Sequence, residues 1–196
     1  MFCGRGRLLL ASVLVGIVLV GCGVQAAPGQ FTLVAPGGQT RLIYDPPPAR
    51  LAVPAIAGDS LTAPGATVGT ADFPGQVLVI NVWGSWCGPC RAETPELEQV
   101  QGRTRARGVQ FLGIDVRDDR SAAADFVRDR AVSYPSIYDP PGRSLIALRG
   151  FPRNVVPSTI VLDRSHRVAA VFLRAVLAED IEPLVDRLAA EPVPSG

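Results

Sequence analysis

Two cysteines separated by two residues, Cys87 and Cys90, are the pair best suited to chemistry in this 196-residue chain. They follow an apolar run rich in β-branched residues and precede a helical stretch, so a helix is expected to begin at them. The unpaired N–H groups and partial positive charge of a helix N-terminus stabilise a thiolate there. A bond between the two would close only a small ring and remove little chain entropy, so a purely structural disulfide explains them poorly. The spacing therefore predicts a redox pair that works by thiol–disulfide exchange.

The two cysteines have different predicted roles. Cys87, the first, is expected to be exposed and to act as the nucleophile that attacks a substrate disulfide. Cys90 lies inside the helix and is expected to be better shielded, so it would resolve the mixed disulfide. Pro89, between them, suits the first turn of a helix, where a missing N–H group costs nothing.

The rest of the composition excludes several other functions. Cys3 and Cys22 lie in the N-terminal segment, which leaves Cys87 and Cys90 as the only thiols of the mature domain. Zinc needs four ligands, and the only histidine, His166, stands in a distant polar turn. We expect no metal and no cofactor beyond the redox-active disulfide. The formal net charge of +1, without a run of basic residues, argues against a nucleic-acid partner.

The N-terminal segment has the pattern of a bacterial export signal. A short basic start precedes the uncharged apolar run from Leu8 to Val20, which is too short to span a membrane comfortably. Leu19-Val20-Gly21-Cys22 resembles the lipobox of bacterial lipoproteins. That resemblance implies a signal peptide over residues 1–21, acylation of Cys22, and a lipid-anchored protein. An uncleaved anchor helix is the alternative, and either one places the folded part at the extracytoplasmic face of the cell membrane.

Residues 22–50 are rich in proline and glycine and are expected to form a tether. Two short strand-like runs, Phe31–Val34 and Arg41–Tyr44, flank the turn-forming sequence Ala35-Pro-Gly-Gly38, which predicts a small β-hairpin. The hairpin could dock on the main domain, or the whole segment could be a disordered tether, and the sequence leaves both open. Residues 191–196 are expected to be a short tail.

Residues 51–190 carry the pattern of a three-layer α/β/α domain with a mixed central sheet. Two continuous apolar runs predict strands buried on both faces, and the helix between them implies parallel pairing. A polar turn later in the chain predicts an antiparallel hairpin. The expected elements, in chain order, are a strand over 76–83, a helix over 87–105, a strand over 109–116, a helix over 121–130 with Ser121 as N-cap, a hairpin of 158–162 with 168–173, and an amphipathic helix over 178–190.

Trp86-Cys87-Gly88-Pro89-Cys90 resembles the active site of the thioredoxin superfamily, and Pro95 stands where thioredoxins have a helix-kinking proline. Val156-Pro157 is similar to the family's cis-proline loop, which faces the two sulfurs and binds substrate backbone. The resemblance covers roughly residues 51–190. It implies a thioredoxin-like fold and a cis peptide bond before Pro157, where cis geometry is least costly. It also implies substrate contacts from Trp86, Gly88, Pro89, Val156 and Pro157.

Two residues point to one group within the superfamily. Where cytoplasmic thioredoxins carry a buried Asp, this chain has Asn81, and Glu93 follows Cys90 by three residues on the same helix face. The combination is similar to the membrane-tethered TlpA/ResA group, which includes CcsX-type proteins, and in which a Glu at this place assists thiol proton transfer. Burial beside the disulfide would raise the pKa of Glu93 and suit it to that role. A solvated Glu93 would only offset the helix dipole.

The resemblance to ResA implies reduction of the oxidised CxxCH motif of apocytochrome c, with a CcdA-type membrane carrier as electron donor. The Gly88-Pro89 pair favours a reductant, since the potential of thioredoxin is about −270 mV and that of the oxidant DsbA about −120 mV. The same chemistry run as an extracytoplasmic thiol oxidase is the main alternative. A peroxidase is disfavoured because neither cysteine has the peroxiredoxin pattern, and a lipoprotein that only binds partners is a third alternative. We expect a monomer.

Overall fold

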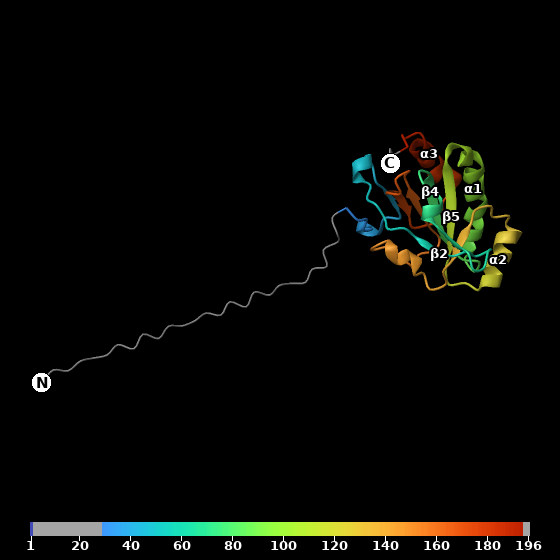
Figure 1. Cartoon of the computed structure of the whole chain (residues 1–196), viewed down its shortest axis with the longest axis horizontal. Coiled ribbons are helices and arrows are strands. Elements are labelled where there is room, and N and C mark those ends of the chain that lie inside the picture. The colour runs from blue at the N-terminus through green and yellow to red at the C-terminus, as the bar shows by residue number, and fades with distance from the viewer. Residues whose placement is uncertain (2–28, 194–196) are drawn as a thin grey trace.

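A mixed six-stranded β-sheet forms the centre of the protein in the computed structural model, which describes residue 1 and residues 29–193 (Figure 1). The strand order is β1-β8-β7-β4-β5-β6. Neighbouring strands are parallel in β4-β5-β6 and antiparallel in β1-β8-β7-β4. The strands are β1 (Arg41–Ile43), β4 (Val77–Trp83), β5 (Val109–Asp115), β6 (Ser136–Tyr138), β7 (Ser158–Leu162) and β8 (Val168–Phe172). The expected parallel pair and the expected hairpin are both confirmed.

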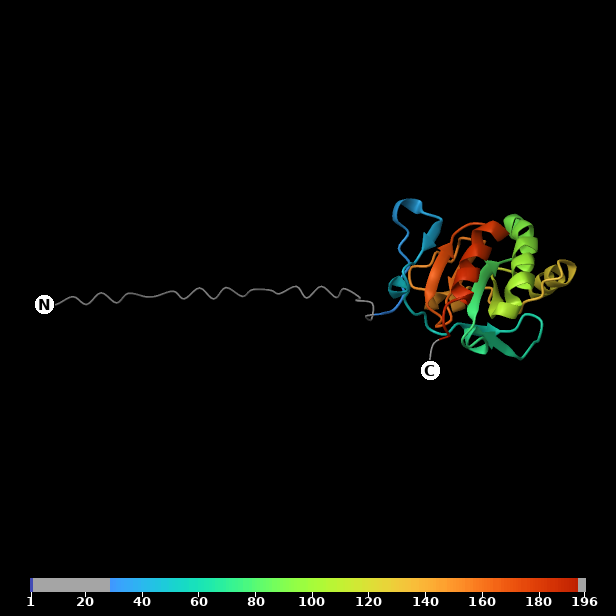
Figure 2. The same ribbon diagram turned by 90° about the horizontal axis from the view of Figure 1, so that it is seen from above.

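Three helices cover one face of this sheet. They are α1 (Gly88–Thr104), α2 (Arg120–Asp129) and α3 (Ala178–Ala189). Both parallel connections advance in the same direction across the sheet, so their right-handed crossovers place α1 and α2 on the same side. Figure 2 shows α1 in green beside α3 in red, and both pack on the sheet through one apolar cluster. That cluster joins Leu97 and Val100 of α1 with Ile181, Val185 and Leu188 of α3.

The opposite face is covered by a short 3-10 helix, η5 (Ser144–Ala147), and by the segment that begins at residue 29. Phe31, Leu33 and Leu145 pack there against the other side of β4 and β5. The predicted thioredoxin-like α/β fold with a mixed sheet is confirmed. Its third layer, within the residues described, consists of these shorter segments, because the connection from β6 to β7 that crosses this face contains only the 3-10 helix η5.

The predicted hairpin between Phe31–Val34 and Arg41–Tyr44 is wrong, because the two runs pair with different partners. Amides of the first run donate to the carbonyl groups of Ala52 and Arg149, with N to O distances of 3.0 and 2.8 Å. The second run forms β1, which pairs with β8 at the edge of the main sheet. The turn between them, η1 (Pro36–Gly38), does form, but its arms diverge.

Residues 30–50 are therefore part of the folded domain. Phe31, Leu33 and Leu42 are each less than a tenth exposed. Of the two alternatives for the predicted tether, docking is the one found for residues 30–50. The predicted signal peptide over residues 1–21 and the acylation site Cys22 lie outside the described residues.

Arg50 joins the N-terminal segment to the C-terminal end of the chain. Its side chain is 1% exposed and contacts three carboxylates. The guanidinium lies 2.7 Å from Glu191, 3.1 Å from Asp45 and 3.3 Å from Asp163. Three acids compensate the cost of burying the cation. Glu191, expected to begin a tail, is instead held by this contact.

The remaining elements are short. β2 (Ala57–Asp59) and β3 (Thr67–Gly69) form a hairpin that the sequence analysis did not predict, and it packs on β6. The other 3-10 helices are η2 (Pro47–Ala49), η3 (Thr70–Asp72) and η4 (Arg105–Arg107). The N-cap of α2 is Asp119 rather than Ser121, because the Asp119 carboxylate accepts the amide hydrogens of Ser121 and Ala122. Among the described helices, none has the length and apolar character needed to cross a bilayer.

Candidate active site

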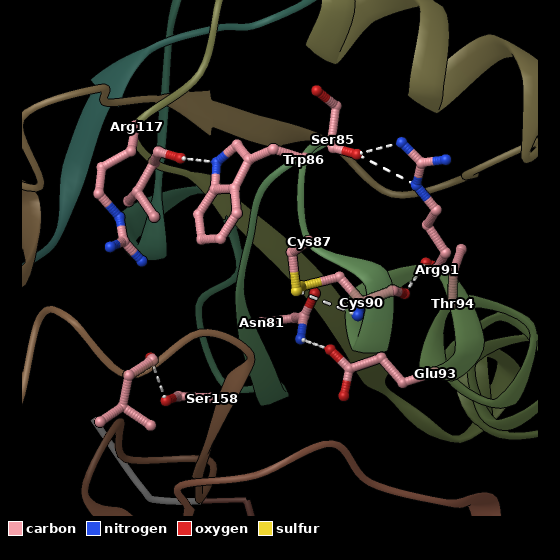
Figure 3. The surroundings of a disulfide bond; sticks show 12 residues. Asn81, Ser85, Trp86, Cys87, Cys90, Arg91, Glu93, Thr94, Arg117 and Ser158 are labelled. Carbon is pink, nitrogen blue, oxygen red and sulfur yellow. Dashed lines mark hydrogen bonds between the residues drawn. A yellow bond between two sulfur atoms is a disulfide. The ribbon is translucent and has the colours of Figure 1, made fainter.

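The Cys87–Cys90 disulfide lies where β4 ends and α1 begins (Figure 3). Cys87 is the N-cap of α1, and its Sγ accepts a hydrogen bond from the amide of Cys90 at 3.1 Å. The sulfur therefore lies at the positive end of the helix dipole, where a thiolate is stabilised once the pair is reduced. Gly88 and Pro89 form the exposed first turn of the helix.

Cys87 is buried, which contradicts the expectation that it would be exposed. Only 3% of Cys87 and 1% of Cys90 is accessible in the disulfide form. Both belong to an apolar cluster with Trp83 and Phe126, and Val156 packs against it. The local sequence could not reveal this cover, because Phe126 and Val156 are supplied by α2 and by the loop before β7.

Glu93 is buried one helical turn after Cys90, with 1% of the residue exposed. Its Oε1 accepts a hydrogen bond from Asn81 Nδ2 at 2.8 Å, and its Oε2 accepts one from the Val176 amide at 3.1 Å. Burial raises the pKa of Glu93, and the two hydrogen bonds lower it by less. The net result is a pKa of about 7, compared with an ordinary 4.5. The alternative of a solvated Glu93 is therefore wrong.

Asn81 holds this carboxyl from the floor of the site. It lies in the middle of the sheet, opposite Gly113 of β5 and Thr159 of β7. In Figure 3 its side chain lies beside the disulfide and points to Glu93. Because an amide does not titrate, Glu93 is the one member of this pair that can exchange a proton.

The peptide bond between Val156 and Pro157 is cis, as the family resemblance implied. The next residue, Ser158, pairs with Val82 in the sheet, so the loop reaches the end of β4 from which the active-site turn leaves. Ser158 Oγ donates to the Val155 carbonyl at 2.7 Å and fixes the loop from below. The cis-proline loop thus forms one wall beside the disulfide.

The two tryptophans of the motif have different environments. Trp83 is buried, stacks on Phe126 with 4.8 Å between ring centroids, and donates to Ser136 Oγ at 3.3 Å. The Trp83 indole lies so close to Gly113 that a Cβ atom on residue 113 would be only 2.7 Å from Trp83 Nε1. Trp86 is 47% exposed and donates to the Val116 carbonyl at 3.1 Å. Trp86 is therefore available to a substrate, whereas Trp83 is part of the core.

Two acids beside the active-site turn were missed by the sequence analysis. Asp118 accepts hydrogen bonds from the amide and the hydroxyl of Ser85 and so fixes the turn. Asp115, at the end of β5, is fully buried, and neither of its oxygens meets a donor within the described residues. Burial, and then the neighbouring Asp118, raise the pKa of Asp115 to about 8. An acid inside a strand predicted to be buried on both faces was the signal that could have found it.

Comparison with known proteins identifies a family and several relatives. The Redoxin family model matches residues 48–186. The thiol:disulfide interchange protein DsbE of Pseudomonas aeruginosa is 32% identical over 144 residues, which are 71% of this chain and 76% of the relative. The thiol-disulfide oxidoreductase ResA of Geobacillus kaustophilus is 26% identical over 112 residues, which are 57% of this chain and 63% of the relative.

Two solved structures of higher identity share the fold. A secreted thiol-disulfide isomerase from Corynebacterium glutamicum is 43% identical, with a TM-score of 0.81 over 83% of this chain and 99% of that one. A DsbF homologue from Corynebacterium diphtheriae is 44% identical, with a TM-score of 0.76 over 81% of this chain and 99% of that one.

Proposed function

Because this chain belongs to the Redoxin family and is a thiol–disulfide oxidoreductase of the DsbE/ResA type, we propose a specific substrate for it. In this proposal, it reduces the CxxCH disulfide of apocytochrome c outside the cytoplasm. The observation that carries the proposal is the buried Asn81–Glu93 pair behind Cys90. It is the feature through which the chain resembles ResA, and it supplies a proton acceptor for the second thiol.

In the first step, the Cys87 thiolate attacks one sulfur of the substrate disulfide. A mixed disulfide forms between that sulfur and Cys87, and the other substrate sulfur leaves as a thiolate. The position of Cys87 at the N-terminus of α1 stabilises the attacking thiolate. We assign binding of the substrate backbone to the surface formed by Trp86, Gly88, Pro89, Val156 and Pro157.

In the second step, Cys90 gives its proton to Glu93, and the resulting thiolate attacks the sulfur of Cys87. The second substrate sulfur also leaves as a thiolate, so two electrons have passed to the substrate, both of its thiolates take protons from solvent, and Cys87–Cys90 is oxidised. A Glu93 pKa of about 7 lets the carboxyl accept and release this proton near neutral pH. The cycle closes when a donor dithiol reduces the pair, a role that we assign to a CcdA-type membrane carrier.

The same proposal includes the location of the enzyme. Cleavage after residue 21 and acylation of Cys22 would hold a monomer at the extracytoplasmic face of the membrane, close to such a carrier. The Gly88-Pro89 pair supports the reducing direction, because it is the pair found in thioredoxin.

One trapping experiment tests the substrate. Cys90→Ala removes the resolving thiol, so substrates should remain covalently bound to Cys87 in cells and be identified by mass spectrometry. The double variant Cys87→Ser with Cys90→Ala is the matched control, because it should capture nothing. Apocytochrome c among the captured proteins is the expected result. Capture of other exported proteins alone would remove the cytochrome assignment and leave the oxidoreductase activity intact.

An extracytoplasmic thiol oxidase is the second candidate. The observation that keeps the direction of electron flow open is the 43% identity to a structure described as a secreted thiol-disulfide isomerase, a name that implies no net reduction. The presence of Glu93 does not distinguish a reductase from an oxidase, because in the oxidising direction the same carboxyl would return a proton to Cys90. A reduction potential measured well above about −200 mV would favour the oxidase, and one near that of thioredoxin would favour the reductase.

A further inference from the structure

Arg117 spans the two loops that flank the disulfide. It lies two residues after Asp115, the last residue of β5, and its backbone has a φ of 55°. Its guanidinium lies 4.5 Å from the centroid of the Trp86 ring, and its Nη2 donates to the carbonyl of Asn154 at 3.5 Å. In Figure 3 the side chain extends alongside the indole. A left-handed backbone at a residue other than glycine is costly, and such residues concentrate at functional sites.

The guanidinium keeps most of its hydrogen-bonding capacity. It has five N–H donors, of which the contact with Asn154 uses one. Arg117 is exposed, and within residues 29–193 it forms no ion pair with an Asp or Glu side chain. The nearby acid, Asp118, is occupied by the amide and hydroxyl of Ser85. An arginine with a free fork of donors is suited to bind a carboxylate in a bidentate manner.

The wall beyond Arg117 has the same sign of charge. Residues 149–157, which end in the cis-proline loop, include Arg149 and Arg153 and contain no acidic residue. Both arginines are exposed. A peptide that lies between Trp86 and this loop therefore meets positive charge on the side of Arg117, and opposite charge on the peptide would speed its association.

From this arrangement we propose that Arg117 is a specificity-determining residue that selects disulfides whose flanking sequence carries an Asp or Glu. The proposal rests on the proposed reductase function and adds the charge of the preferred substrate. The cation–π contact holds the guanidinium over Trp86, and the remaining donors face the substrate. Because the pair would be exposed, we expect an effect of roughly fivefold in rate.

The test uses three disulfide-closed Cys-x-x-Cys-His peptides that differ only in the residue before the first cysteine, which is Glu, Gln or Lys. The pre-reduced wild-type protein should reduce the Glu peptide about fivefold faster than the Lys peptide, and the ratio should approach one at high salt. Arg117→Gln should bring the ratio near one, and Arg117→Glu should invert it. Arg105→Glu is the matched control, with the same charge change at the far end of α1, about 25 Å along the helix from the active-site turn.

Each outcome decides a different point. If the wild type reduces all three peptides at one rate, the selectivity of Arg117 is refuted while the reductase function stands. If it reduces none of them, the proposed function itself fails. A ratio that Arg105→Glu shifts as much as Arg117→Glu would show a general charge effect and would also refute the role of Arg117. Arg117→Gln removes the charge without introducing an opposite one, so it decides the matter if Arg117→Glu does not fold.

Discussion

The side-chain amide of Asn81 donates a hydrogen bond to the carboxyl of Glu93 at 2.8 Å, and both residues are at most 2% exposed. An amide that cannot titrate thus holds an acid that titrates near neutral pH. The pair lies behind Cys90 on the side away from solvent. Proton exchange with the second thiol is the role that we propose for this contact.

Glu93→Gln should slow the second step of disulfide exchange. Removing a general acid–base group typically costs about 10²-fold or more in rate, and the pH dependence that it causes disappears with it. We expect the wild-type rate of mixed-disulfide resolution to rise through a pKa of about 7 and the variant rate to lack that rise. Stopped-flow measurements between pH 5 and pH 9 check this, with the exposed Glu179→Gln as control. An unchanged profile in Glu93→Gln would exclude the proton transfer.

The same substitution should stabilise the oxidised protein at alkaline pH. The pKa of Glu93 is raised by folding, so the folded state holds its proton more tightly, and stability falls as pH rises from about 4.5 through about 7. Above that range the buried charge costs up to about 3 kcal/mol, which Glu93→Gln removes. Urea unfolding should therefore show a more stable variant at pH 8.5 and no such gain at pH 4. A variant that is less stable at both values would contradict the raised pKa.

Asp115→Asn should have a similar effect over a wider pH range. The pKa of Asp115 is raised from 3.8 to about 8, so ionisation destabilises the folded state progressively as pH rises between these values. The neutral amide keeps the shape of the side chain and can donate to Asp118. We expect a gain on the order of several kcal/mol at pH 9 and little change near pH 4. Loss of stability at pH 9 would mean that the folded protein stabilises the charged form of Asp115.

Arg50→Ala should destabilise the fold strongly. The substitution leaves Asp163, whose side chain is 6% exposed, without its buried cation, and the loss expected for breaking a buried ion pair is about 3–5 kcal/mol. Arg128→Ala is the matched control, because its partners Asp125 and Asp129 are exposed and such pairs contribute about 0–1 kcal/mol. Urea titration of the two variants compares them. A loss below about 1 kcal/mol in Arg50→Ala would show that the contact is not maintained in solution.

Phe31→Ala tests whether the N-terminal segment belongs to the fold. Phe31 is 3% exposed in the core, so its truncation should cost about 3–5 kcal/mol of unfolding free energy. Val34→Ala, three residues later, removes a side chain that is 67% exposed and should change stability by less than about 0.5 kcal/mol. If both substitutions had equally small effects, this segment would not be packed on the domain and would be a tether.

Sequence patterns predicted those elements whose signal is local. The apolar runs of β4 and β5 are long and continuous because both faces are buried, and Cys87 and Pro89 mark the start of α1. The N-cap of α2 was placed two residues late, since Asp119 and Ser121 are both good caps and geometry decides between them.

The features that were missed depend on contacts between distant segments. The local pattern of Phe31–Val34 predicts a hairpin strand, but in the folded protein this segment bonds to Ala52 and Arg149 instead. The burial of Cys87 depends on Phe126 and Val156 in the same way. The site residues Glu93 and Asn81 were found through the resemblance to the TlpA/ResA group, which could be carried over because their spacing to the cysteines is fixed along one helix and one strand.

The 3% and 1% exposure of the two cysteines has a kinetic consequence. A small thiol diffusing in bulk solution collides with the covering side chains far more often than with a sulfur. A protein partner can bind over the indole and the cis-proline loop long enough for the sulfurs to meet. We therefore expect the oxidation state of this enzyme to follow its partners and to be insulated from the pool of small thiols around it.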